Sequence, residues 1–301
     1  MFAPAAGRTR YLGPILRSLR VQQWVKNLFV LAPLLFSKRI FEGPRDLALA
    51  LAAFGLFCIA SGVVYLVNDV MDLQADRAHP TKRHRPLASG ALPIGVAIRA
   101  ATTMVGGSML LAFLLDYRFA LTLAGYLLLN LAYSRGLKHL PWIDVLCIAA
   151  GFVLRVAGGG LVIRVDVSQW LVLCTFLLAL VLGLGKRKHE LEALAGAREG
   201  RRGVLDRYNP RTLDVGLVTA ATATIAAYTF YTIDPRTIGF FNTDRLNWTV
   251  PLIVFGILRF LQLVDKPHAD SPTEEMLRDK VFLANVALWF GAVLWLVGSG
   301  R

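Results

Sequence analysis

Long apolar segments separated by short polar stretches run through almost the whole chain. They predict helices at 24–37, 46–68, 93–115, 119–134, 142–163, 168–185, 212–231, 248–264 and 281–299. A helix of about 20 apolar residues crosses the roughly 30 Å hydrocarbon core of a bilayer, and most of these segments approach that length. The pattern therefore predicts an all-α integral membrane protein with about nine transmembrane helices.

Composition agrees with this class and excludes most others. Of the 301 residues, 55% are hydrophobic and 18% are charged, and the mean hydropathy is +0.54. A soluble domain needs more polar residues to cover its surface. The net charge of +13 does not indicate nucleic-acid binding, because membrane proteins gather basic residues in cytoplasmic loops. Cys58, Cys147 and Cys174 lie in apolar segments without C-x-x-C spacing, so neither a disulfide framework nor a zinc site is expected.

The distribution of Lys and Arg predicts the orientation of the chain. Basic residues concentrate before the first apolar segment and in alternate loops after it. The positive-inside rule places these loops and the N-terminus in the cytoplasm. We expect a multi-pass protein of the inner (plasma) membrane, with residues 1–301 forming a single transmembrane domain.

Four polar residues that directly follow the second apolar segment are the strongest chemical signal. On a continuous helix, Asn68, Asp72 and Asp76 share one face, with Asp69 beside them and Tyr65 one turn earlier. Mg²⁺ binds one or two protein carboxylates and completes its shell with water and substrate phosphates. We therefore expect Asn68, Asp72 and Asp76 to hold Mg²⁺. The alternative, a solvated helix end, is disfavoured because acids are favoured at helix N-termini.

Cationic residues are predicted on the same side of the membrane. Lys82 and Arg83 follow the acidic motif closely and are candidates for phosphate binding, although an ordinary positive-inside loop also explains them. The other cations at helix ends on this side are Lys26, Lys138, Lys186 and Arg187.

Arg155 lies inside the fifth apolar segment, where an ionisable side chain is costly and points to function. An anionic lipid headgroup is its preferred partner, and a structural pair with a buried acid is the alternative. Asp144 is too distant along a straight helix to be that acid.

The spacing Asn68-Asp69-x-x-Asp72-x-x-x-Asp76 resembles the N-D-x-x-D-x-x-x-D signature of the UbiA superfamily of membrane prenyltransferases. The resemblance covers nearly the whole chain and implies a helical bundle with a cytoplasmic site for Mg²⁺ and a diphosphate. Aromatic prenyltransferases of this superfamily carry a second aspartate-rich motif near the sixth helix. Here the comparable place reads Gly185-Lys186-Arg187-Lys188, which is cationic.

Six blocks resemble the branch of the superfamily that transfers 5-phosphoribose from phosphoribosyl diphosphate to a polyprenyl (decaprenyl) phosphate. They are Gln23–Asn27, Tyr65–Asp69, His79–Arg83, Gly136–His139, Gly151–Arg155 and Gly185–Arg187. The resemblance implies a Mg²⁺-dependent enzyme that supplies lipid-linked arabinose donors for the cell wall, and it points to a homo-oligomer, with a trimer as one form.

The expected roles follow from this chemistry. We assign the donor to Lys26, Tyr65, Asp69, Lys82, Arg83 and Lys138, and the lipid phosphate to Arg155, Lys186 and Arg187. The runner-up function is an aromatic prenyltransferase with a prenyl diphosphate donor. A transporter or lipid flippase is disfavoured, because the polar residues gather on one side rather than near the bilayer midplane.

Overall fold

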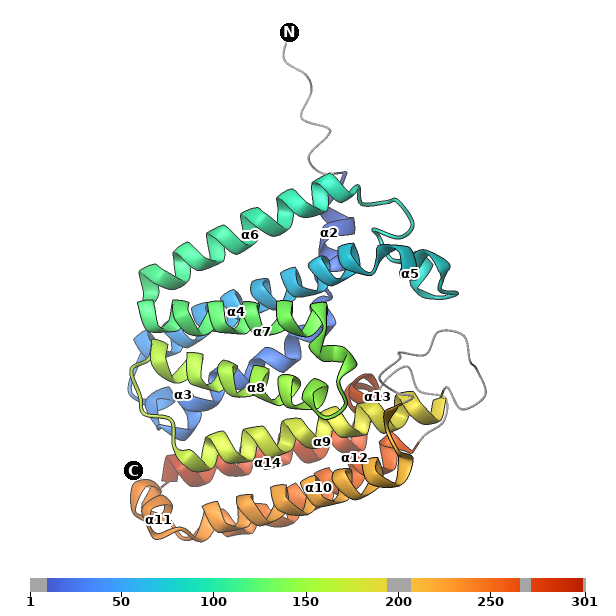
Figure 1. Cartoon of the computed structure of the whole chain (residues 1–301). Helices are drawn as coiled ribbons and strands as arrows, with labels where there is room; N and C mark the ends of the chain where they lie inside the picture. The colour runs from blue at the N-terminus through green and yellow to red at the C-terminus, as the bar shows by residue number, and fades with distance from the viewer. Residues whose placement is uncertain (1–9, 194–206, 266–271, 300–301) are drawn as a thin grey trace. The chain divides into compact units, whose positions relative to one another are not determined.

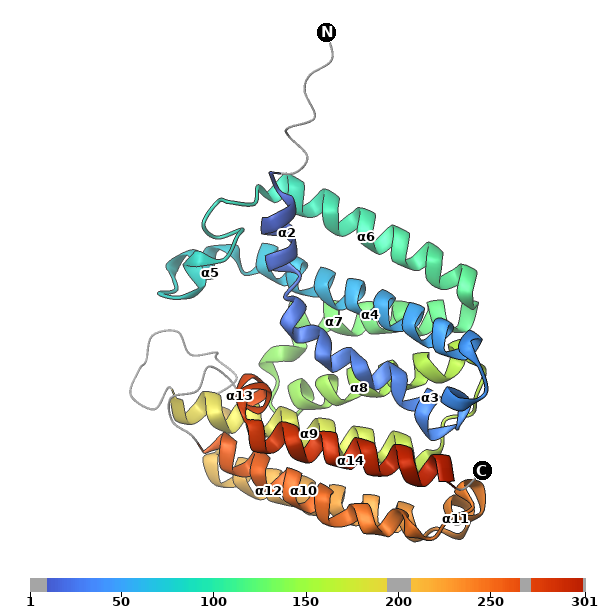
Figure 2. The same ribbon diagram turned by 180° about the vertical axis from the view of Figure 1, so that it is seen from behind.

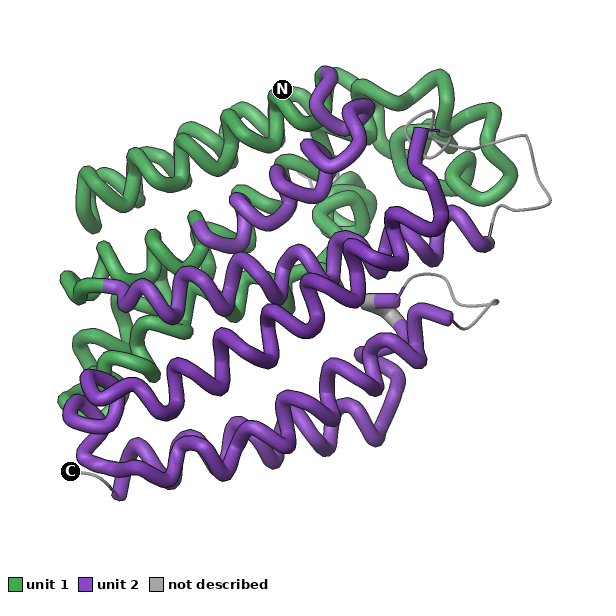
Figure 3. Tube along the Cα trace, turned by 60° about the horizontal axis from the view of Figure 1, so that its bottom comes forward, with its two compact units in different colours: residues 1–135, 154–166 green, residues 136–153, 167–301 purple. Residues whose placement is uncertain are grey.

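A computed structural model describes residues 10–193, 207–265 and 272–299. Nearly all of these residues are helical. The chain divides into two compact units, residues 1–135 with 154–166 and residues 136–153 with 167–301 (Figure 3). The division falls within helix α8 (Ile143–Val162).

The first unit holds the N-terminal helices and the second part of α8. Its elements are α2 (Leu12–Ser18), η1 (Val21–Leu31), α3 (Ala32–Phe36), η2 (Arg39–Phe41), α4 (Pro44–Met71), α5 (Leu73–Ala78), η3 (Lys82–His84), α6 (Ile94–Leu115) and α7 (Tyr117–Arg135). Helix α4 contacts η1, α6 and α7. Both views place α2 and α5 at the C-terminal end of α4 (Figures 1 and 2).

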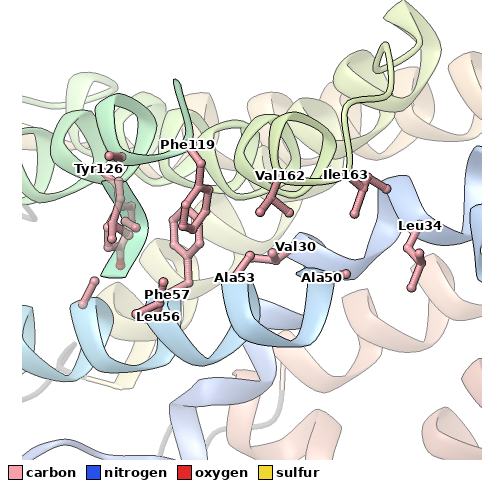
Figure 4. Packing of buried hydrophobic residues seen from close by; sticks show 14 residues of the cluster. Val30, Leu34, Ala50, Ala53, Leu56, Phe57, Phe119, Tyr126, Val162 and Ile163 are labelled. Carbon is pink, nitrogen blue, oxygen red and sulfur yellow. The ribbon is translucent and has the colours of Figure 1, made fainter. Parts of the chain in front are cut away.

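Aromatic rings connect α4 and α7 in the core of this unit. Phe119 and Tyr126, seven residues apart on α7, lie beside each other and point toward Phe57 on α4 (Figure 4). The centroid of the Phe57 ring lies 5.9 Å from that of Phe119 and 5.4 Å from that of Tyr126, and both pairs have edge-to-face geometry. Such pairs add stabilisation beyond that of the area they bury, so they fix how α7 lies against α4.

Glycines in α8 permit a close approach of backbones. A Cβ atom on Gly159 would lie 1.9 Å from the carbonyl oxygen of Val30 in η1, and one on Gly158 would lie 2.8 Å from the Phe57 ring. The helix runs unbroken through both glycines. Gly159 therefore permits the close packing of α8 against η1, and Gly158 permits its packing against Phe57 of α4.

The second unit contains η4 (Leu137–His139), the first part of α8, α9 (Gln169–Ala193), α10 (Pro210–Ile233), α11 (Pro235–Phe241), η6 (Arg245–Thr249), α12 (Val250–Val264), α13 (Pro272–Arg278) and α14 (Lys280–Ser299). Helix α9 packs along α10, and α12 packs against α14. Its core includes Val181 and Leu184 of α9, Leu213 of α10 and Phe260 of α12.

The membrane-protein class is confirmed, whereas the count of about nine spans is not. Seven helices within the described residues are long and apolar enough to cross a bilayer. Each of the nine predicted segments is helical, but 24–37 consists of the 3₁₀ helix η1 and the short α3, and 119–134 corresponds to α7, which is not among the seven. A 3₁₀ stretch of 11 residues is unusually long, and apolar content alone could not distinguish it from an α-helix.

Candidate active site

The acidic motif lies at an interruption between two helices. Helix α4 ends at Met71, Asp72 adopts φ −92° and ψ 10°, and α5 begins at Leu73. Backbone hydrogen bonds of 2.8 Å still join Asp72 N–H to Asn68 and Asp76 N–H to Asp72. The helix is therefore interrupted at the single residue Asp72, while the four-residue hydrogen-bond pattern that joins Asn68, Asp72 and Asp76 is kept.

Two arginines form ion pairs with Asp69 and Asp76, the acids on either side of Asp72 in this motif. Asp69, which is buried, accepts a hydrogen bond of 2.6 Å from Arg20 and one of 3.2 Å from Arg85. The same Nη1 of Arg85 donates to Asp76 over 2.6 Å. Charge-assisted pairs of this kind are among the stronger hydrogen bonds in proteins. The structure thus joins the start of η1, the end of α4, α5 and the loop after η3.

Asn68 and Tyr65 are held by different neighbours. The side-chain oxygen of Asn68 accepts a hydrogen bond from Ser134 at the end of α7. The Arg20 guanidinium carbon lies 4.7 Å from the centroid of the Tyr65 ring, within the range of a cation–π contact. Both side chains are half-buried, as is Asp72.

The basic stretch after α5 forms the short helix η3. Lys82 is half-buried and Arg83 is exposed. The Nδ1 atom of His79 accepts hydrogen bonds from the backbone N–H groups of Thr81 and Lys82. Desolvation, followed by the nearby Lys82 ammonium, lowers the pKa of the His79 imidazole below its ordinary value, so the ring is mostly neutral at pH 7.

Arg155 lies in a buried polar cluster of the first unit. Its Nε donates to the Asn27 side chain over 2.7 Å, and its Nη2 donates to the Tyr126 hydroxyl over 3.0 Å. Asn27 in turn donates to Ser61 on α4 over 3.0 Å. These bonds satisfy polar groups that would be costly inside a membrane helix, and they fix the backbone of η1 next to Lys26, which is half-buried.

In the second unit, Arg187 is buried in a network of its own. Its Nε lies 2.6 Å from Asp144, and Nη1 pairs with Glu190. Asp144 also accepts a hydrogen bond of 2.6 Å from Tyr208. Burial, and then this hydrogen bond, raise the pKa of the Tyr208 phenol above its ordinary value. Lys186 pairs more loosely with Glu190, at 3.9 Å, and Lys138 is half-buried on η4.

The predicted residues thus divide between the two units. The first contains Lys26, Tyr65, Asn68, Asp69, Asp72, Asp76, Lys82, Arg83 and Arg155, and the second contains Lys138, Lys186 and Arg187. Four residues that the sequence did not assign to the site belong to the same networks: Arg20, Arg85, Ser134 and Asp144. Arg85 lies in the basic loop after the motif, but no feature of the neighbouring sequence distinguishes it from the other cations there.

The motif offers few oxygen ligands for Mg²⁺, so substrate would have to complete the shell of the cation. No group of three or more His, Cys, Asp or Glu side chains that could hold a metal ion is found within the described residues. Asn68 and Asp72 offer two oxygen ligands, and Asp76 offers a third where Arg85 releases it. Mg²⁺ commonly keeps several waters and takes substrate phosphates instead of a full set of protein ligands.

The fold and these polar networks define a multi-pass helical membrane protein with an acid–arginine cluster at the end of one of its spans. A family model described as the UbiA prenyltransferase family matches residues 28–297. The chain belongs to this family.

Relatives and solved structures agree with this assignment. Decaprenyl-phosphate phosphoribosyltransferase from Corynebacterium glutamicum is 35% identical over 292 residues, which cover 94% of this chain and 86% of the relative. The protein of that name from Mycolicibacterium smegmatis is 32% identical over 308 residues, covering 96% and 94%. A UbiA homologue from Archaeoglobus fulgidus, solved with DMAPP and Mg²⁺, has a TM-score of 0.69 at 18% identity, covering 94% of this chain and 99% of that one. At that identity it demonstrates the shared fold alone.

Proposed function

We propose that this protein transfers 5-phosphoribose from phosphoribosyl diphosphate to a polyprenyl phosphate, such as decaprenyl phosphate, and releases diphosphate. One observation carries the proposal: relatives that bear the name decaprenyl-phosphate phosphoribosyltransferase are 32% and 35% identical to nearly the full chain. The cationic end of α9, where aromatic prenyltransferases carry acids, supports it. The product is a precursor of lipid-linked arabinose donors for cell-wall biogenesis.

The first unit binds the donor diphosphate in this proposal. Asn68 and Asp72 hold Mg²⁺, and Asp76 contributes directly or through water. When bound, Mg²⁺ neutralises the charge that develops on the diphosphate leaving group. Asp69 is a donor-site residue that acts through its two arginines, and Lys26, Tyr65, Lys82 and Arg83 are the other donor residues of this unit. Lys138, in the second unit, is the remaining residue that we assign to the donor.

The second set of cations neutralises the lipid phosphate. Lys186 has the most accessible side chain of the three candidates and contacts the phosphate directly. Arg155 and Arg187 are buried in their own networks. In this proposal both contribute positive charge to the lipid phosphate, and through their hydrogen bonds they also hold the surrounding backbone.

Transfer requires orientation more than acid–base chemistry. A phosphate oxygen of the lipid forms a bond to C1 of the ribose, and the C1–O bond to diphosphate breaks with its electron pair leaving on diphosphate. The lipid phosphate is already ionised near pH 7, so no general base is needed. Holding both reactants in line provides most of the rate enhancement, and cations around the leaving group provide the rest.

The proposal includes a location and an assembly. The donor is a water-soluble metabolite and the acceptor tail is apolar, so the site lies at the cytoplasmic face of the plasma membrane, with the N-terminus on the same side. Residues 1–301 act as one domain, since the family match runs through both compact units. A homo-oligomer, with a trimer as one form, remains part of the proposal.

A direct assay tests the function. Purified protein in detergent receives labelled phosphoribosyl diphosphate, Mg²⁺ and either a polyprenyl phosphate or an aromatic acid with a prenyl diphosphate. We expect label in the lipid product only, and we expect a folded Asp72→Ala variant to lose at least 100-fold in rate, about 2.7 kcal/mol of transition-state stabilisation. Prenylation of the aromatic acid without phosphoribosyl transfer contradicts the proposal.

A further inference from the structure

Two arginines link the outer acids of the motif into a chain of alternating charge. Arg20 Nη2 lies 2.6 Å from Asp69 Oδ1, and Arg85 Nη1 lies 3.2 Å from that same oxygen. Arg85 Nη1 also lies 2.6 Å from Asp76 Oδ2. The order of charges is therefore Arg20, Asp69, Arg85, Asp76, and the two acids flank Asp72 in the sequence.

The two kinds of side chain differ in their access to water. The side chains of Asp69 and Asp76 are 3% and 5% exposed, whereas those of Arg20 and Arg85 are 30% and 29% exposed. The arginines thus lie between the buried acids and the solvent. An anion that approaches from the water meets the guanidinium groups before it meets the carboxylates.

Arg20 is also held in an uncommon backbone conformation. Its φ of 50° and ψ of 60° lie in the left-handed region, which residues other than glycine occupy only when surrounding contacts hold them there. The pair with Asp69 and the stacking on Tyr65 are such contacts. The position of this guanidinium is therefore imposed by the fold.

These pairs oppose the binding of a divalent cation alone. A cation that binds Asp69 or Asp76 must share the negative charge of that carboxylate with a guanidinium that is already paired with it, and it is repelled by the positive charge of that guanidinium. A diphosphate changes this balance, because its oxygens give the arginines new partners and complete the shell of the cation.

We propose that Arg20 and Arg85, through their ion pairs with Asp69 and Asp76, make divalent-cation binding at this motif depend on the donor diphosphate. This inference rests on the proposed function. Coupling between two ligands is reciprocal, so the donor likewise binds well only with the cation. The arginines thereby keep the motif from filling with metal before the donor arrives.

Mn²⁺ binding without donor is the test. Free Mn²⁺ is measured by electron paramagnetic resonance in titrations of the full-length wild type, Arg20→Gln and Arg85→Gln. We expect each variant to bind Mn²⁺ at least tenfold more tightly than the wild type. A second measurement compares the binding of labelled phosphoribosyl diphosphate in Mg²⁺ and in EDTA, and the ratio of the two affinities should fall in both variants.

Two further variants serve as controls. Arg39 also pairs with two acids, Glu42 at 2.8 Å and Asp46 at 3.6 Å, but it lies at the opposite end of α4. Arg39→Gln should therefore leave Mn²⁺ affinity unchanged. Arg20→Lys keeps the charge next to Asp69 and should stay within a few-fold of the wild type.

Each outcome decides between the alternatives. Unchanged or weaker Mn²⁺ binding in Arg85→Gln contradicts the inference, and this test stands even where Arg20→Gln does not fold. A wild type that binds the donor equally well with and without Mg²⁺ also contradicts it. A wild type that binds no phosphoribosyl diphosphate in Mg²⁺ overturns the proposed function and, with it, the donor dependence.

Discussion

Adjacent cations at the end of α9 have very different surroundings. Arg187 is 1% exposed and is paired with Asp144 and Glu190, whereas the side chain of Lys186 is 38% exposed. Removing one partner from a buried ion pair leaves the other charge uncompensated in a region of low dielectric constant. The two residues should therefore respond differently to the same substitution.

We expect Arg187→Ala to destabilise the protein by about 3–5 kcal/mol, because it removes the positive partner of the buried Asp144 carboxylate. Lys186→Ala should leave the melting temperature near that of the wild type and raise KM for the lipid phosphate. Melting in detergent and steady-state kinetics measure the two effects. An Arg187→Ala protein with wild-type melting and weakened lipid binding indicates that Arg187 is a direct phosphate ligand.

Buried arginines in this protein are held by more than one element. Arg155 bonds to η1 through Asn27 and to α7 through Tyr126, so it connects three helical segments of the first unit. A polar side chain at membrane depth marks either a ligand or such a junction. Here the junction is visible, and the lipid contact remains a proposal.

At the scale of elements, η1 and α8 lie so close together at Gly159 that no room remains for a side chain there. The Val30 carbonyl occupies the space where Gly159 would carry a Cβ, at 1.9 Å. A backbone atom cannot yield as a flexible side chain does, so any larger residue must push the helices apart. Because η1 also carries Lys26 and Asn27, this contact sets the position of part of the donor site.

Gly159→Ala should therefore lower the melting temperature and the activity together, with a cost of at least about 1–3 kcal/mol from overpacking. Gly107→Ala on α6 is a matched control, since no atom lies within 4 Å of its Cβ position. It should be neutral or slightly stabilising, because alanine favours a helix interior. Equal melting of the two variants contradicts this account of the packing.

At the scale of the whole molecule, orientation in the membrane decides which compartment the site faces. Exposed apolar residues along α6 and α14, such as Phe113, Leu114 and Trp295, are suited to lipid contact. They do not distinguish one face of the membrane from the other. The distribution of Lys and Arg does, through the positive-inside rule.

Cysteine labelling tests this orientation at two exposed positions. Ser89→Cys, in the loop before α6, should react with a membrane-impermeant thiol reagent only from the cytoplasm. Asp244→Cys, before η6, should react only from outside. The native cysteines Cys58 and Cys147 are buried and Cys174 is partly buried, so the protein with no added cysteine measures the background. The reverse pattern inverts the topology and removes the site from the compartment of the donor.

Much of the fold was predictable because the relevant signals are local. The length and apolar character of a segment determine whether it can form a membrane helix, and all nine predicted segments are helical. The 3₁₀ geometry of η1 over 11 residues had no signal in the composition of 24–37. The interruption at Asp72 had no local signal either.

The sequence by itself determined the membrane class, the family resemblance and the spacing of Asn68, Asp72 and Asp76, since each is a property of neighbouring residues. Only the tertiary structure decided which charges are paired. Arg20 reaches Asp69 across 49 positions, and Arg85 reaches it across 16. A cation in a sequence has the same charge whether it lies in water or in a buried pair. Its partner and its desolvation are set by distant segments that meet only when the helices pack.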